Sequence, residues 1–416
     1  MKTPEDPMTG PLKKLPIYPV QRLTALVADV PPAHGLTPIL FSVGEPRHAQ
    51  PAAVGEIMGR CPPGSLGAYP SVVGSPALRE AIAAWLGRRF APAVVDPACE
   101  VQVVNGTREG LFSLTRTVLD SSPPDAYVVY PNPGYAVYEG ATVLNGLRSW
   151  VYDSTTASRH GEVFLSVPEH VWARTALLFV CSPDNPMGGV QQLDAWRTIF
   201  ELSDQHGFTV VVDECYSEIY TGDEPPLGAL QAATLLGRSF ERLVVLSSLS
   251  KRSNVPGLRS GFMAGDRAIL TQAARLRSYN GGGMNPVVDA ASVAAWNDEA
   301  HVQDSREKYR EKYRHVIPLM QRALTIATPD AGFFLWADIA RTGLSDEEFT
   351  RQLYAQQSVL VMPGSYLSSA FGPEPIRQRV RIALVAALEE CMEGARRLQA
   401  FVDSLEPAQS LNLETA

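Results

Sequence analysis

The stretch from Leu243 to Phe262 reads LVVLSSLSKRSNVPGLRSGF, and it opens with an apolar run that is typical of a buried strand. Serines follow, and a single lysine, Lys251, comes at the point where the strand is expected to end. Arg259 stands further on, after the turn residues Pro256 and Gly257. A lysine directly after a buried strand is poorly placed for a solvated surface charge, so the role of Lys251 has to be judged together with the residues that follow the other predicted strands.

Similar apolar runs occur along the first two thirds of the chain and alternate with segments of helical periodicity. This alternation predicts an α/β fold with a mostly parallel central sheet and helices on both faces. The runs, besides the one already quoted, are VQVVN (101–105), AYVVY (126–130), ALLFVCSP (176–183), FTVVVDE (208–214) and GFMAG (261–265).

The pattern changes after Asn285, where a long helical stretch precedes further short apolar runs, and this change predicts a second, smaller α+β domain. The runs in that part are GFFLWADIA (332–340), SVLVMPG (358–364) and RQRVRIALV (377–385). We expect four parts: an N-terminal arm at 1–36 with a short helix in VQRLTALVADV, a large domain at 61–295, a small domain from 37–60 and 296–405, and a frayed tail at 406–416.

Composition places the chain among ordinary globular proteins, with 416 residues, 45% hydrophobic and 19% charged residues, and a net charge of −8. The acidic balance argues against nucleic acid or an anionic membrane as the main partner. The five cysteines form no CxxC pair, so we expect neither a disulfide framework nor a metal site. With no apolar segment at the N-terminus, the chain is expected to be cytoplasmic.

Polar and aromatic residues follow the predicted strands, and in open α/β sheets ligands bind at these carboxyl ends. Singly, each has an ordinary structural explanation as a helix cap, a turn residue, a core-edge aromatic or a surface charge. Together they would bring every group that one cofactor needs to the same edge of the sheet. The residues are Gly106, Thr107, Tyr135, Asn185, Asp213, Tyr216, Ser248, Lys251 and Arg259.

That cofactor is pyridoxal 5′-phosphate, an aldehyde on a pyridine ring with a phosphate group. The aldehyde requires a lysine amine (Lys251), and the ring nitrogen requires a carboxylate (Asp213). The ring hydroxyl suits an amide and a phenol (Asn185 and Tyr216), with Tyr216 near enough in sequence to Asp213 to serve the same end of the sheet. The phosphate suits a helix N-terminus, hydroxyls and a guanidinium, which Gly106, Thr107, Ser248 and Arg259 supply.

The chain resembles the fold-type I, class I and II aminotransferases, which depend on pyridoxal phosphate, from about residue 15 to about residue 405. The motifs that carry the resemblance are AYPSVVGSPALREAIAAW (68–85), NGTREGLF (105–112), PNPGYAVYEG (131–140), SPDNPMGG (182–189), VVDECYSEIY (211–220), SSLSKRSNVPGLRSGF (247–262) and RVRIALV (379–385). Met187 stands where the family usually has threonine.

The resemblance implies a role for each matching residue. Lys251, Asp213 and Tyr216 would be catalytic, and Tyr135 would stack on the ring. Tyr69 would reach the phosphate in the neighbouring subunit of a homodimer. Arg381 and Gly44, together with Asn185, would bind the substrate. Arg377 and Arg379 share a strand face with Arg381, so only the motif position selects Arg381.

Within the family, DECYSEIY, AAWNDEAHV and VRIALVAALEEC resemble N-succinyldiaminopimelate aminotransferases of lysine biosynthesis. This resemblance implies ping-pong exchange of an amino group between glutamate and N-succinyl-2-amino-6-oxopimelate. Arg47 is a candidate for the distal carboxylates of that substrate, although a solvated loop arginine is an equal explanation. An aspartate, alanine or aromatic aminotransferase, a β-lyase and a pyridoxal-phosphate-sensing regulator remain alternatives.

Overall fold

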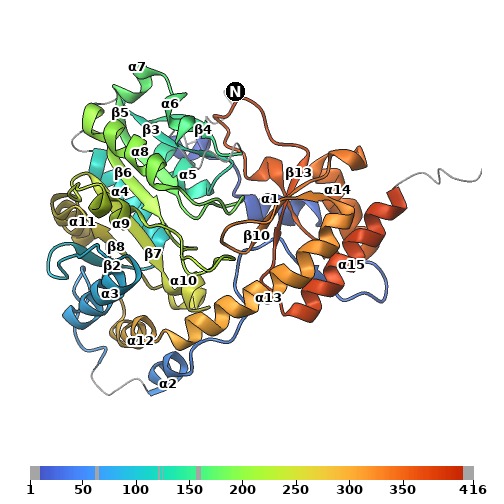
Figure 1. Ribbon diagram of the computed structural model, residues 1–416, viewed down its shortest axis with the longest axis horizontal. Helices are drawn as coiled ribbons and strands as arrows, with labels where there is room; N and C mark the ends of the chain where they lie inside the picture. Colours follow the sequence, from blue (N-terminus) through green and yellow to red (C-terminus); the bar gives the residue numbers. More distant parts are fainter. Residues whose placement is uncertain (1–9, 61–64, 120–121, 124, 156–160, 406–416) are drawn as a thin grey trace, which may run out of the picture.

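The chain forms two bodies that lie side by side, each with its own sheet (Figure 1). The structure, a computed structural model, describes residues 10–60, 65–119, 122–123, 125–155 and 161–405. The predicted tail at 406–416 and the first nine residues of the predicted arm lie outside the described residues. In the described part of the arm, α1 (Pro19–Leu26) confirms the predicted short helix.

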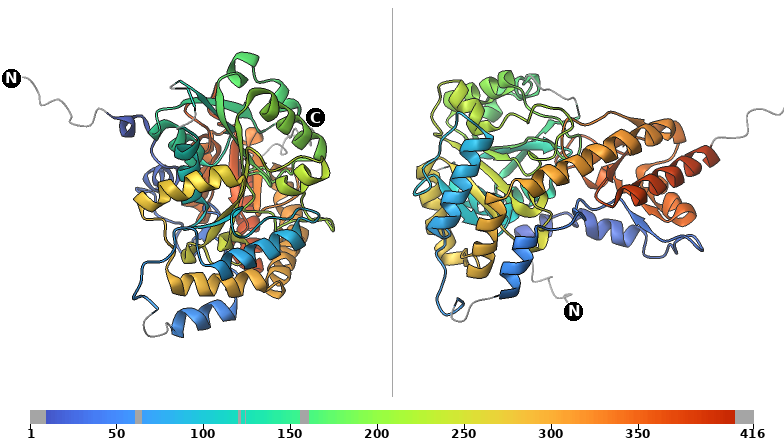
Figure 2. Two further views of the ribbon diagram at one scale, coloured as in Figure 1. Left: turned by 90° about the vertical axis from the view of Figure 1, so that its left-hand side faces the viewer. Right: turned by 60° about the horizontal axis from the view of Figure 1, so that its bottom comes forward.

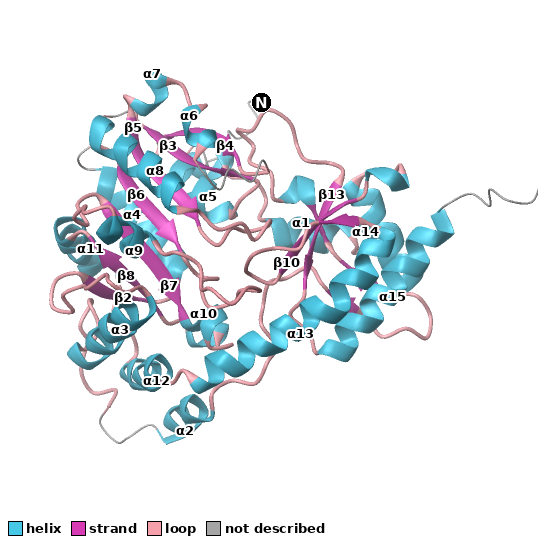
Figure 3. Cartoon of the chain, viewed as in Figure 1, coloured by secondary structure: helices cyan, strands magenta, loops and turns pink. Residues whose placement is uncertain are grey.

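The larger body contains a seven-stranded sheet in the order β2-β8-β7-β6-β5-β3-β4. Strand β8 runs in the opposite direction to the other six strands, which are parallel to one another, so the prediction of a mostly parallel central sheet is confirmed. Figure 3 shows these strands side by side within the larger body. Their bounds are β2 Val101–Val104, β3 Tyr127–Asn132, β4 Arg148–Asp153, β5 Thr175–Cys181, β6 Thr209–Asp213, β7 Leu243–Ser248 and β8 Gly261–Gly265.

Strand β4 is the one strand of this sheet that the sequence analysis did not predict. The other strands are buried at every position, because helices cover both faces, and so they read as continuous apolar runs. Strand β4 lies at the sheet edge, and only Tyr152 of its six residues is fully buried. Its sequence, RSWVYD, therefore has no apolar run to detect.

Helices pack on both faces of the large sheet, as predicted. One face is covered by α4 (Thr107–Leu119), α5 (Ala136–Leu144) and α11 (Arg267–Asn280). The other is covered by α3 (Pro76–Arg89), α6 (Glu162–Leu165), α7 (Glu169–Trp172), α8 (Leu193–His206), α9 (Ala229–Leu235) and α12 (Pro286–Asn297). Every helix in the described part of the chain is too short or too polar to cross a membrane.

The smaller body has a four-stranded antiparallel sheet in the order β12-β13-β10-β9 and a parallel pair, β1 and β11. Its helices pack over one apolar core that is separate from the cores of the large sheet. The strands are β1 Ile39–Leu40, β9 Thr325–Ile326, β10 Phe334–Asp338, β11 Val359–Leu360, β12 Met362–Pro363 and β13 Arg379–Ala383, and the helices are α13 Ala300–Ala323, α14 Asp346–Gln357 and α15 Leu388–Leu405.

Two boundaries differ from the sequence-based expectation. Helix α2 (Ala52–Arg60) packs against α12, and its Val54 belongs to the core of the large sheet, so residues 52–60 lie with the larger body. The long helical stretch after Asn285 breaks between α12 and α13, where the Asp298 carboxylate accepts the Ala300 N–H at 2.9 Å. We propose a large domain at 52–297 and a small domain from 37–51 and 298–405.

Candidate active site

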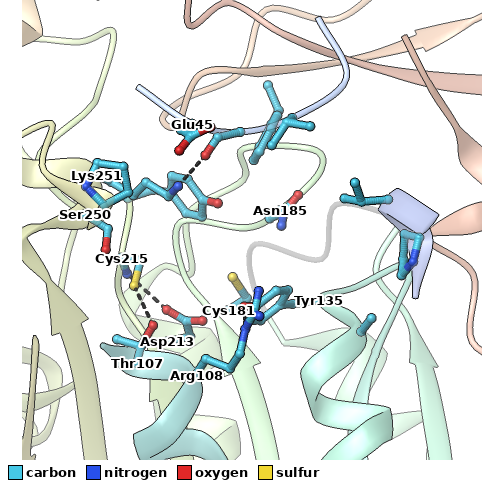
Figure 4. Close-up of a pocket in the computed structure, with 18 of the residues that line it drawn as sticks. Glu45, Thr107, Arg108, Tyr135, Cys181, Asn185, Asp213, Cys215, Ser250 and Lys251 are labelled. Carbon is cyan, nitrogen blue, oxygen red and sulfur yellow. Dashed lines mark hydrogen bonds between the residues drawn. The ribbon is translucent and has the colours of Figure 1, made fainter. Parts of the chain in front are cut away.

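A cavity of about 520 Å³ lies between the two bodies, at the carboxyl ends of β5, β6 and β7. Residues of the small-domain strands β10, β12 and β13 close its other side. Figure 4 shows side chains from both bodies pointing into it. The residues predicted from the sequence that line it are Gly44, Thr107, Tyr135, Asn185, Asp213, Tyr216, Ser248, Lys251, Arg259 and Arg381.

Lys251 sits on the short helix α10 (Leu249–Arg252), which directly follows β7. Its Nζ donates a hydrogen bond to the carbonyl of Gly44 (Figure 4) and lies 5.6 Å from the centre of the Phe333 ring. Burial lowers the pKa of Lys251 to about 8, and the nearby Arg381 guanidinium acts in the same direction. Near neutral pH the amine is therefore uncharged far more often than an ordinary lysine, as a nucleophile requires.

Asp213 ends strand β6, and its carboxylate is buried, with 5% exposure. It accepts hydrogen bonds from the Tyr138 hydroxyl and the Cys215 backbone N–H, both at 3.2 Å. Burial raises the pKa of Asp213, so the site favours a cationic or proton-bearing partner for this carboxylate. A protonated ring nitrogen is such a partner.

A further part of the cavity wall combines a helix N-terminus with a guanidinium. Thr107 opens the 13-residue helix α4, and Gly106 precedes it with φ +85°. The Arg259 guanidinium donates to the carbonyls of Asn105 and Pro256 at 3.2 and 3.1 Å. A Cβ at Gly106 would lie 2.2 Å from that guanidinium, so this approach requires glycine. Helix N–H groups and a guanidinium together form a site for a phosphate.

Arg381, from strand β13, is buried with 7% exposure and faces the cavity from the small domain. It donates to Asn185 Oδ1 and to the Ser42 carbonyl, both at 3.0 Å, and stacks 4.1 Å above the Phe334 ring. Its Nε has no hydrogen-bond partner among the described residues. Burial lowers the pKa of Arg381 to about 10, and a buried cation of this kind favours an anionic ligand.

Several lining residues were missed in the sequence, among them Cys215 and Arg108. Cys215 Sγ lies 3.4 Å from the Thr107 hydroxyl and 3.7 Å from that of Ser248. Arg108 donates to the hydroxyls of Tyr135 and Tyr18, both at 3.0 Å. The position of Cys215, two residues after Asp213, was the only signal in the sequence. The contact of Arg108 with Tyr18 depends on how the arm folds back.

Not every predicted residue is brought into the cavity. Tyr69 is 103% exposed, and Arg47 is half-exposed and pairs with Glu390 at 3.3 Å. Arg377 is exposed and Arg379 pairs with Asp338 at 3.1 Å, so of these three strand arginines only Arg381 lines the cavity.

The comparison with protein families decides which chemistry this cavity belongs to. Residues 37–398 match the family model described as aminotransferase class I and II. The chain belongs to this family. Its members depend on pyridoxal phosphate, and the fold is that of the fold-type I aminotransferases.

Relatives cover nearly the whole chain. The chain is 33% identical to the 4-dedimethylamino-4-oxo-anhydrotetracycline transaminase OxyQ of Streptomyces rimosus, over 86% of this chain and 92% of the relative. It is 30% identical to the LL-diaminopimelate aminotransferase of Desulforudis audaxviator, over 85% and 88%.

Solved structures agree with these relatives. An aminotransferase from Neisseria meningitidis is 40% identical with a TM-score of 0.89, covering 96% of this chain and 100% of that one. A probable N-succinyldiaminopimelate aminotransferase from Thermus thermophilus is 26% identical with a TM-score of 0.79, covering 92% and 98%.

The chemistry of the lining residues fits pyridoxal phosphate. The buried Asp213 carboxylate suits the ring nitrogen, and the Lys251 amine, with its lowered pKa, suits the aldehyde. The corner formed by Gly106, Thr107 and Arg259 suits the phosphate, because it combines a helix N-terminus with a guanidinium that donates to two backbone carbonyls and pairs with no carboxylate among the described residues.

Proposed function

We propose that the chain is an aminotransferase that exchanges an amino group between glutamate and N-succinyl-2-amino-6-oxopimelate, with N-succinyl-LL-2,6-diaminopimelate as the product. The observation that carries the aminotransferase part is the cavity that Lys251, Asp213 and Arg381 share. The motif resemblance and the Thermus thermophilus relative support the substrate. The LL-diaminopimelate aminotransferase relative, at 30% identity, supports unsubstituted LL-diaminopimelate as a second candidate.

In this proposal, Arg381 binds the substrate α-carboxylate, since its guanidinium is buried and its planar fork matches a carboxylate. Asn185 orients Arg381 through Oδ1, and the backbone at Gly44 leaves room because a Cβ there would lie 2.4 Å from the Phe334 ring. This arrangement fixes one end of the amino acid beside the Lys251 amine.

Pyridoxal phosphate, when bound, supplies an aldehyde that links to amines and a ring that withdraws electrons from the substrate Cα. We assign to Lys251 two roles: its amine would hold the aldehyde, and it would transfer the proton of the substrate Cα. Asp213 holds the ring nitrogen in its protonated form, and Tyr216 and Asn185 face the ring hydroxyl. Tyr135 covers the ring, while Gly106, Thr107, Ser248 and Arg259 hold the phosphate.

The proposal also includes a cytoplasmic homodimer in which Tyr69 reaches the phosphate of the neighbouring subunit. The proposal gives Arg47 no role at the distal carboxylates, because its side chain pairs with Glu390 and does not line the cavity.

A panel of single half-reactions tests the substrate. Holoenzyme is mixed with glutamate, N-succinyl-LL-diaminopimelate, LL-diaminopimelate, aspartate, alanine or phenylalanine, and the cofactor absorbance is followed. We expect glutamate and one diaminopimelate substrate to react with the highest kcat/KM. A higher kcat/KM for aspartate, alanine or phenylalanine than for both diaminopimelate substrates would overturn the proposed substrate.

A further inference from the structure

A small annex of about 40 Å³ adjoins the main cavity, and nothing described so far accounts for it. It lies between the N-terminal arm, helix α5 and the small-domain segment 366–369. The two spaces share a wall: Pro19, Gly134, Tyr135, Ala136 and Leu367 line both. The two spaces are therefore neighbours, with the annex next to the part of the cavity that Tyr135 and Leu367 line.

The annex contains a buried carboxylate whose hydrogen bonding is incomplete. Glu139, on α5, is 6% exposed. Its Oε2 accepts the Ala370 N–H at 3.1 Å, and the nearby Ser369 hydroxyl also lowers the pKa of this carboxyl group, but Oε1 has no hydrogen-bond partner within 3.5 Å among the described residues. An unpaired buried carboxylate oxygen is costly, and burial raises the pKa of Glu139 accordingly. A ligand that donates an N–H to Oε1 would remove that cost.

A cation lies at the rim of the same annex. The Arg22 guanidinium stacks 3.8 Å above the Tyr366 ring and lies 3.8 Å from Glu347, which is longer than a normal hydrogen bond. Its side chain is 35% exposed, so its N–H groups can meet a carboxylate. The annex thus offers an acceptor for N–H at its buried end and a donor for a carboxylate at its rim.

We propose that this annex receives the far amino-acid end of the substrate, with Glu139 accepting the N–H of the distal nitrogen and Arg22 facing the distal carboxylate. This inference rests on the proposed diaminopimelate-type substrate. An ammonium and an N-succinyl amide both carry the required N–H, so the subsite serves either candidate. Arg381 and the annex would then bind the two ends of one long substrate.

A matched pair of ligands isolates the distal nitrogen. LL-2,6-diaminopimelate and L-2-aminopimelate have the same carbon chain and both carboxylates, and differ only in that nitrogen. We expect the holoenzyme to favour diaminopimelate by about tenfold or more in kcat/KM. Glu139→Gln keeps an oxygen for the Ala370 N–H but turns an amide N–H₂ toward the annex, and it should abolish this preference.

Two further variants complete the design. Arg22→Gln should weaken both ligands by a similar factor, because both carry the distal carboxylate. Glu374→Gln is the control for Glu139→Gln. It makes the same change of charge at an exposed position beyond segment 366–369, and it should keep the wild-type preference for diaminopimelate. No preference in the wild type, or full preference in Glu139→Gln, would overturn the inference for Glu139. If Arg22→Gln binds diaminopimelate and aminopimelate as tightly as the wild type does, the role of Arg22 at the distal carboxylate is wrong.

Failure of the proposed substrate is distinguishable from failure of the annex. If the wild type transaminates neither of these ligands nor N-succinyl-LL-diaminopimelate, the proposed substrate is wrong, and calorimetry on the holoenzyme gives the two dissociation constants directly. Tighter binding of diaminopimelate that is lost in Glu139→Gln supports the annex even then. Equal dissociation constants overturn it.

Discussion

Lys251 is the residue on which the proposed chemistry depends most directly. Lys251→Ala should lower turnover by a factor of at least about 10²–10⁴, the usual contribution of a positioned acid–base group. Borohydride reduction followed by mass spectrometry should add the mass of the cofactor to the wild type and not to the variant. Lys308→Ala, at a side chain that is 43% exposed, is the control and should behave as the wild type. Normal turnover by Lys251→Ala would refute the assignment.

The low pKa of Lys251 predicts the pH dependence of cofactor binding. A lysine attacks an aldehyde only when it is uncharged, so its reactivity rises as the pH passes its pKa. Burial places that pKa at about 8 instead of the usual 10.5. The rate at which pyridoxal phosphate attaches to the apoprotein should therefore rise with a midpoint near pH 8, as followed by absorbance. A rate that keeps rising to the pKa of a free lysine would show that the amine is not desolvated.

Arg381 should not tolerate replacement by lysine, although the charge is kept. A single ammonium cannot donate to Asn185 and Ser42 and also grip a carboxylate with a planar fork. From the roughly 2 kcal/mol lower limit for disrupting a buried charged pair, Arg381→Lys should reduce kcat/KM at least about 30-fold for every amino acid tested. Arg377→Lys, on the exposed approach to the same strand, is the matched control. Equal losses in both variants would contradict the assignment.

The start of helix α4 is the element whose backbone the phosphate site needs most. Gly106→Ala adds a Cβ 2.2 Å from the Arg259 guanidinium, at φ +85°, where a side chain costs about 1–2 kcal/mol. Because about 1.4 kcal/mol corresponds to a tenfold change, the dissociation constant for pyridoxal phosphate should rise about tenfold. Gly222→Ala, where a Cβ meets no atom within 4 Å, should leave it unchanged. Retention of cofactor can be followed by equilibrium dialysis.

The elements that could be predicted from the sequence are those whose burial leaves a continuous pattern. The buried strands β2, β3, β5, β6, β7 and β8 were all found, and β4 was missed because only one of its six residues is buried, so its sequence does not need a continuous apolar run. The break between α12 and α13 depends on the local cap at Asp298 and not on periodicity.

The residues of the cavity also fall into those that the sequence predicts and those that depend on tertiary packing. Residues at strand ends were predictable, because parallel strands end at one edge of the sheet. Cys215, Tyr138 and the Arg108–Tyr18 contact were not, because they depend on how helices and the arm pack over that edge. Arg47 is the opposite case, because its place in the motif predicted a substrate contact and its side chain pairs with Glu390 instead.

At the scale of the whole molecule, the cavity is lined by both domains and therefore depends on their relative position. Lys251 and Asp213 come from the large body and Arg381 from the small one (Figure 2 shows the two bodies with α13 running between them). The Lys251 bond to the Gly44 carbonyl joins a large-domain side chain to the segment that leads into the small domain. A change in the relative position of the domains would therefore move Arg381 relative to Lys251, and substrate binding and domain position should be coupled.

The proposed homodimer predicts that two inactive variants regain activity when they form a mixed dimer. Tyr69 is fully exposed here, and the adjacent Pro70 packs against the loop at Gly283, so Tyr69 projects outward from a supported segment. If Tyr69 serves the neighbouring site, Tyr69→Ala should lose cofactor and Lys251→Ala should lose turnover. A mixed dimer of the two variants restores one complete site, with Lys251 from one chain and Tyr69 from the other. Mixing and refolding the variants together should regain up to about a quarter of wild-type activity, since about half the dimers are mixed and each has one intact site of two. No regain, with dimers confirmed by sedimentation, would place Tyr69 outside the site.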